Sequence, residues 1–356
     1  MKKFSLLVMI SMLAVASAAV PALAQEDTPE GKCYQEWYDA AQNKKDIPLA
    51  AKLGKGCLEK FPQSQYAKFW KQSINKYVAQ LQQTFYNTLK DVNQDPTKIE
   101  KLITDGQAVL EWKPDDVGVP IYTALATTYV AMLNNKDLDR AKTYSEKALQ
   151  IVENPTVPPD VPKDQYEALR ETAKAKLNQY MGFYYLKQNP PNYDQGETYL
   201  TKSIGIKSKG AGEGWKDANN YYMRTEVYTK QYDTLRAEYD ALSEDDKRGP
   251  KGTAILDKIA PIVEKLIMDY ARVVALATDP RAKALQDDAK ERLESFWKFR
   301  QEGKTDGMMA YVKGFEADPT VNQPLPPAPE KAPDKAPQPA PGKPPVKGKP
   351  GKPSGR

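Results

Sequence analysis

Residues 122–155, with the sequence YTALATTYVAMLNNKDLDRAKTYSEKALQIVENP, decide the fold class of this chain. Apolar residues recur at every third or fourth position on both sides of the polar run NNKDLD, and this spacing is typical of amphipathic helices. Pro155 closes the stretch, and proline rarely continues a helix. The stretch therefore predicts two helices joined by a tight turn, and the fold depends on whether the chain repeats this hairpin.

Helical periodicity extends from residue 32 to about residue 317, without the apolar–polar alternation of a half-buried strand. Asp95-Pro96 and Asp279-Pro280 each have the form of an N-cap followed by the first helical residue. Pro261 lies within a helical run, where we expect it to kink or restart the helix. The predicted helices are 31–43, 47–61, 64–91, 96–112, 117–134, 137–152, 163–188, 192–206, 215–242, 253–278, 280–302 and 305–316.

The opening hairpin places large and small residues at fixed intervals. The positions are Tyr122, Leu125, Ala126 and Tyr129 in the first helix and Ala141, Ser145 and Ala148 in the second. This spacing resembles the tetratricopeptide repeat, whose first helix carries W-x2-L-G-x2-Y. In that family the small residues let the two helices approach closely, and the large ones fill the space between hairpins.

Two other segments reproduce part of the pattern. One has Met181, Gly182 and Tyr185, followed by Gly196, Leu200 and Ser203. The other has Tyr34, Trp37, Tyr38 and Ala41, followed by Ala50, Gly54 and Cys57, with Tyr38 where a small residue is usual. The chain therefore resembles an all-α array of about six such hairpins, which the family winds into a right-handed superhelix.

The resemblance implies a binding surface. In tetratricopeptide proteins the first helices line a concave groove for extended peptides or partner helices. The residues expected to face this groove are Asp39, Thr127, Gln179, Phe183 and Lys187. They are chemically mixed and do not form the regular Lys/Asn set of a peptide-carboxylate clamp.

The first residues, MKKFSLLVMISMLAVASAAVPALAQE, have a basic start, an apolar run and small residues at Ala22 and Ala24. This arrangement is typical of a secretory signal peptide, and we expect residues 1–24 to be removed. The alternative is an uncleaved membrane anchor. An exported chain would be periplasmic or secreted, with its helical domain at 25–318.

Cys33 and Cys57 are the two cysteines of the chain. If two antiparallel helices turn near Lys45, both cysteines lie twelve residues from that turn and face one another. In an exported protein this predicts a disulfide, which would stabilise the fold by about 3 kcal/mol. Two unlinked buried thiols are the alternative.

Residues 319–356 change abruptly to proline, lysine and glycine and lack aromatic residues, so we expect a disordered tail. The formal charge of the whole chain is +5, and the seven basic and two acidic residues of 320–356 account for this excess. Since the body is close to neutral, nothing in the charge points to nucleic acid. The tail is either a ligand for an anionic envelope polymer or a spacer.

Histidine is absent, which excludes serine–histidine and cysteine–histidine catalysis and metal sites that need imidazole. Glu111, Asp115 and Asp116 could supply paired carboxylates for glycan cleavage on a helical toroid, but they also fit an ordinary helix end. We expect no enzyme, cofactor or metal. The favoured function is an exported scaffold for protein–protein interaction in the cell envelope. The alternatives are attachment through the basic tail and, more distantly, a glycan-cleaving enzyme.

Overall fold

The computed structural model describes residues 28–154, 156–157, 162–207 and 213–328. Within these ranges the chain is all-helical and contains no strand. The predicted signal peptide at 1–24 and most of the predicted tail lie outside the described residues. The all-α prediction is therefore confirmed for the part of the chain that the structure describes.

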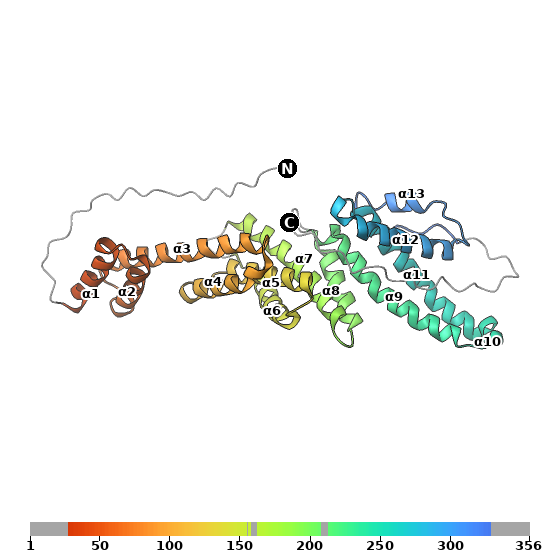
Figure 1. The fold of residues 1–356 in the computed structure, drawn as a ribbon, viewed down its shortest axis with the longest axis horizontal. Helices are drawn as coiled ribbons and strands as arrows, with labels where there is room; N and C mark the ends of the chain where they lie inside the picture. Colours follow the sequence, from red (N-terminus) through yellow and green to blue (C-terminus); the bar gives the residue numbers. More distant parts are fainter. Residues whose placement is uncertain (1–27, 155, 158–161, 208–212, 329–356) are drawn as a thin grey trace. The chain divides into compact units, whose positions relative to one another are not determined.

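Thirteen α-helices occur in the described residues, together with four short helical turns of π or 3₁₀ type (Figure 1). The α-helices are α1 (Pro29–Tyr38), α2 (Ile47–Lys60), α3 (Ala67–Val92), α4 (Ile99–Trp112), α5 (Gly118–Asn134), α6 (Leu138–Glu153), α7 (Lys163–Lys187), α8 (Tyr193–Gly205), α9 (Ala218–Asp240), α10 (Glu244–Arg248), α11 (Pro250–Leu276), α12 (Lys283–Arg300) and α13 (Met308–Lys313). The chain divides into two units, residues 1–81 and 82–356, with the boundary inside α3.

The first unit is built around the hairpin of α1 and α2. A π-helical turn, η1 (Asp39–Asn43), follows α1, and Lys45 then takes a left-handed conformation with φ of 55°. The turn thus lies where the sequence predicts it. Cys33 and Cys57 form a disulfide with a Cα–Cα distance of 5.8 Å, which confirms the predicted pairing.

The core of this unit is small and aromatic. Trp37 and Trp70 are buried, and Trp37 Nε1 donates a hydrogen bond to Ser73 Oγ at 2.9 Å. A Cβ atom built on Gly54 would lie 3.3 Å from the backbone of Trp70, so α2 and α3 cross at close range here. The disulfide supplements a core of limited size, as is usual in small units.

In the second unit most helices pack against their neighbours in the sequence. Contacts join α4 to α5, α5 to α6, α6 to α7, α7 to α8 and α8 to α9, and then α9 to α11 and α11 to α12. Figure 1 shows α9 and α11 running side by side, and α13 also contacts α11. This nearest-neighbour packing is compatible with a helical repeat.

Most predicted boundaries agree with the structure to within three residues. Asp95 and Asp279 are N-caps as expected, accepting backbone hydrogen bonds from Thr97 at 3.1 Å and from Arg281 at 2.9 Å. Two details differ. The helix α11 continues through Pro261 without restarting. The short helix α10 was not predicted, and its N-cap is Ser243, whose hydroxyl accepts a hydrogen bond from the Asp246 amide.

Candidate functional site

The residues that carry the repeat pattern lie mainly at helix–helix contacts. Five of the nine are buried, and the other four, Tyr122, Leu125 and Tyr129 of α5 and Tyr185 of α7, are half-buried. The buried members are Ala126, Ala141, Ala148, Met181 and Gly182. Large residues and small residues thus pack as the pattern requires, although this packing alone does not identify the repeat family.

Residue size separates the buried positions from the half-buried ones. The half-buried four are all large side chains, and four of the buried five are alanine or glycine. Small residues let helix backbones approach, while large ones fill the space beside the contact. The pattern therefore describes packing positions in α5 to α7 rather than a ligand site.

The residues expected to line a groove differ in their exposure to solvent. Thr127 is 4% exposed, and its hydroxyl donates to the Ala124 carbonyl at 2.9 Å. Gln179 is 5% exposed, and its amide donates to Asp217 Oδ2 at 2.9 Å. Gln179 thus holds the start of α9 against α7 instead of facing open surface, because the carboxylate of Asp217 needs a buried partner.

Phe183 and Lys187 lie further along the same face of α7. The Lys187 ammonium lies 5.6 Å from the centre of the Phe183 ring and 3.8 Å from the Glu226 carboxylate of α9. Phe183 is half-buried and Lys187 is exposed. These two side chains therefore remain accessible at the edge of the contact between α7 and α9.

Asp39, the remaining residue expected at the groove, belongs to the first unit. Its carboxylate pairs with Lys44 at 2.6 Å and accepts a hydrogen bond from Asn43 at 3.0 Å. Hydrogen bonds from Lys44 and Asn43 lower the pKa of Asp39 below its usual value. These contacts span the turn η1, so Asp39 has a local structural role there.

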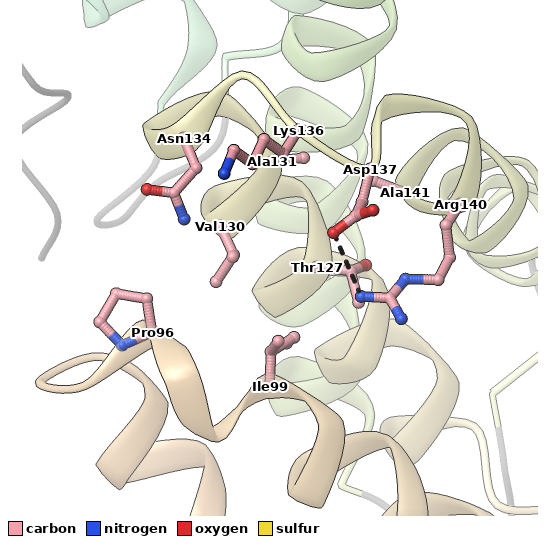
Figure 2. A pocket seen from close by; sticks show the side chains of 10 residues that line it. All are labelled: Pro96, Ile99, Thr127, Val130, Ala131, Asn134, Lys136, Asp137, Arg140 and Ala141. Atoms are coloured by element: carbon pink, nitrogen blue, oxygen red, sulfur yellow. Dashed lines mark ion pairs between the residues drawn. The ribbon is translucent and has the colours of Figure 1, made fainter.

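A pocket in the second unit lies where the turn between α5 and α6 faces the start of α4 (Figure 2). Asn135 and Asp137 take left-handed conformations in this turn, with φ of 52° and 54°. Both residue types tolerate this region better than most. The residues lining the pocket are Pro96, Ile99, Thr127, Val130, Ala131, Asn134, Lys136, Asp137, Arg140 and Ala141.

The pocket has an apolar wall and a charged rim. Ile99, Val130 and Ala131 form the apolar part, and Figure 2 shows Asp137 and Arg140 on the side of the α5–α6 turn. Arg140 contacts Glu100 at 2.7 Å and Asp137 at 3.8 Å. The hydrogen bond from Arg140 to Glu100 raises the pKa of Arg140, so this guanidinium stays charged.

The volume of the pocket is about 160 Å³. A cavity of roughly 150 Å³ accepts a benzene-sized group, whereas sites for drug-sized ligands and cofactors start near 300 Å³. The size therefore suits one amino-acid side chain. Thr127 and Ala141 are the two sequence-predicted residues that line it, and no motif in the sequence indicates that the other lining residues converge.

The second unit also contains a buried ionic centre that sequence reasoning missed. Asp269 of α11 is 1% exposed and accepts two hydrogen bonds from Arg224 of α9, at 2.7 and 2.8 Å. Arg272 donates to the same carboxylate at 2.8 Å. Burial disfavours the charged guanidinium of Arg224, but attraction to Asp269 outweighs it and raises the pKa of Arg224.

Aromatic rings complete this centre. Arg224 lies over the rings of Tyr221 and Tyr228, and Arg272 lies over those of Tyr221 and Phe315. The contacts satisfy two cations that share one anion. A signal was present in the sequence, since an aspartate and an arginine three residues apart interrupt the apolar run LIMDYARVVAL.

Asp116, one of the three acidic residues that could supply a carboxylate for glycan cleavage, has a structural role. Its Oδ1 accepts the backbone N–H of Val119 at 2.9 Å, and its Oδ2 accepts from Gln82 at 2.7 Å. The carboxylate thus caps the first turn of α5. Burial, reinforced by the nearby Asp116 charge, raises the pKa of Tyr86 to about 12.

Two observations bear on location and metal binding. The disulfide between Cys33 and the buried Cys57 indicates an oxidising, extracytoplasmic environment. Among the described residues, no helix is long and apolar enough to cross a bilayer, and no three His, Cys, Asp or Glu side chains are grouped as metal ligands.

Comparisons with models of protein families, with curated proteins and with solved structures give no match for this chain.

Proposed function

We propose that the chain is an exported, tetratricopeptide-like scaffold that mediates protein–protein interaction in the cell envelope. The observation that carries this proposal is the packing of consecutive helices in the second unit, with small residues at the contacts. Helical arrays of this kind stack into an extended surface, and binding is their usual use.

The pocket between α4 and the α5–α6 turn is the proposed contact point for the partner. Its volume of about 160 Å³ suits one apolar side chain against Ile99, Val130 and Ala131. Lys136 at the rim is exposed and has no ion-pair partner among the described residues. The proposed ligand is therefore a peptide segment with an apolar side chain close to an acidic group.

Export is supported by the disulfide together with the signal-peptide pattern of residues 1–24. The alternative function, attachment to a cell-wall or other anionic polymer, is supported by the seven basic residues of 320–356. Such binding would be weak and sensitive to salt, because exposed charges are screened.

Affinity isolation after cross-linking in the protein's own cells separates these two functions. The full chain is compared with a chain that ends at residue 328, which keeps every described residue. The scaffold function predicts one protein partner that both chains retain. Cell-wall material recovered with the full chain alone would instead assign the function to the tail.

A further inference from the structure

The first residues of the predicted tail, PTVNQPLPPA at 319–328, lie against the second unit. Pro319 is buried, and Gln323 and Leu325 are half-buried, whereas Pro324 and Pro326 between and beyond them are exposed. Leu325 packs against the large core cluster of this unit. Exposed and half-buried side chains alternate from Asn322 to Pro326, so one face of this part of the segment is seated on the fold.

Side chains of the body hold this segment by its backbone carbonyl groups. Arg272 of α11 donates to the Val321 carbonyl at 3.1 Å, and the Tyr311 hydroxyl of α13 donates to the Gln323 carbonyl at 3.1 Å. Arg300, at the end of α12, donates to the Pro326 carbonyl. These three hydrogen bonds go to backbone carbonyl groups, which every residue type possesses, so they hold the segment without selecting its sequence.

Two positions on the body, called seats below, contact side chains of the segment. One is formed at Gly314, where an added Cβ atom would lie 2.6 Å from Cδ of Gln323, so a side chain at 314 would displace that amide. The other is the apolar surface that contacts Leu325. The segment 319–328 carries no charged residue, and Arg300 on the body is paired with Glu264 at 3.1 Å.

This combination of features is the chemistry of proline-rich peptide recognition. Proline fixes an extended backbone before binding. Side chains of the groove then donate hydrogen bonds to the backbone carbonyl groups of the peptide, and these bonds do not distinguish one residue type from another. Sequence preference then comes from the seats for individual side chains, here Gln323 and Leu325. Leu325 is the apolar anchor of the segment, since it packs against the large core cluster.

We propose that the surface formed by Arg272, Arg300, Tyr311 and Gly314, named here the strap groove, recognises uncharged extended peptides containing Gln-Pro-Leu-Pro. Residues 321–326 occupy the groove in cis and are its resting ligand. A partner peptide of the same chemistry binds when this segment leaves. The strap groove lies on α11 to α13 and is separate from the pocket between α4 and α6, so this inference does not rest on that pocket.

Tethering explains why such a groove would be closed at rest. A short linker keeps the cis segment at an effective concentration in the millimolar range. A free peptide must compete with this concentration, so its apparent affinity falls although its contacts are the same. Weakening the cis segment alone should therefore expose the groove without altering it.

The test uses the full chain and the fluorescently labelled peptide PTVNQPLPPA. Leu325→Asp removes the anchor of the cis segment and changes no residue of the strap groove. Fluorescence anisotropy should show saturable peptide binding to this variant, with binding to the wild-type chain at least about tenfold weaker. Circular dichroism checks that the variant folds. The milder variant Leu325→Gly should also bind the peptide more tightly than the wild-type chain does.

Controls show which contacts read the peptide. In the Leu325→Asp background, Tyr311→Phe should weaken binding several-fold, whereas Met309→Ala, at a position 50% exposed on the same helix, should not. A peptide with aspartate in place of leucine should not bind. The proposal is overturned if folded Leu325→Asp binds no peptide, if it binds no better than the wild type, or if both peptides bind equally.

Discussion

Gly182 of α7 and Gly196 of α8 lie at a point where the two helices almost touch. A Cβ atom built on Gly182 would lie 3.3 Å from the Gly196 carbonyl oxygen and 2.6 Å from Leu200 Cγ. A Cβ atom on Gly196 would lie 2.8 Å from Leu186 Cδ2. Each helix thus needs a glycine where the other presents a leucine, and this fixes how the hairpin closes.

Gly182→Ala should therefore destabilise the protein by about 1–3 kcal/mol, because overpacking forces neighbouring side chains and backbone to shift. Urea unfolding followed by circular dichroism measures the change. Gly205→Ala is the matched control, since an added Cβ there meets nothing within 4 Å. Equal stability of Gly182→Ala and the wild type would show that the helices are further apart than described.

The disulfide between Cys33 and Cys57 should stabilise the first unit. Replacing both cysteines by serine should cost about 3 kcal/mol, because the cross-link restricts the unfolded chain. Thermal unfolding with and without reductant measures this cost. The wild-type protein should lose stability in reductant, whereas the double variant should be insensitive to it, and a wild type that is equally insensitive would refute the assignment.

Asp269→Asn should be strongly destabilising, by about 3–5 kcal/mol, because it leaves the buried charges of Arg224 and Arg272 without their anion. Chemical unfolding at neutral pH measures the loss. Asp233→Asn on α9 is not a suitable control because Asp233 has partners of its own. The exposed Glu316→Gln is suitable, and it should change stability by less than about 0.5 kcal/mol.

Asp217 makes stability depend on pH. Burial raises the pKa of Asp217, but the charge of Lys176 at 2.6 Å and hydrogen bonds from Gln179 and Asn219 outweigh this and lower it. A carboxylate with a lowered pKa contributes stability above its unfolded pKa, near 3.9, and that contribution is lost as the pH falls through its folded pKa.

Asp217→Asn should accordingly destabilise the protein by about 1–3 kcal/mol at pH 7. The difference from the wild type should shrink as the pH falls below about 4, where the wild-type carboxyl also becomes neutral. Urea unfolding between pH 7 and pH 3 measures it. A difference that stays constant over this range would mean that the charge of Asp217 has no part in stability.

Local signals in the sequence were enough to predict most helices. Asp95 and Asp279 lie directly before prolines, and both are N-caps in the structure. Lys45 marks the turn that brings the two cysteines together. These features depend on residues close in sequence, so they can be read without knowing how the helices pack.

Features that depend on packing were not predictable in the same way. Gln179 was expected at an open groove, but its partner Asp217 lies 38 residues further along the chain. Leu325 was assigned to a disordered tail, although it packs against the large core cluster. The pocket likewise combines Ile99 with residues of α5 and α6, and no spacing within one helix indicates that they meet.

The central claim, that the helical body binds a protein partner at its pocket, is tested most directly by site-specific photo-cross-linking in the protein's own cells. A photoreactive residue replaces Lys136 at the pocket rim or, as a control, the exposed Gln150 of α6. We expect one protein to be cross-linked from position 136 and not from position 150. Val130→Trp, which fills the pocket, should abolish this product, whereas removal of residues 329–356 should not. No product at position 136, or one that survives Val130→Trp, would contradict the account.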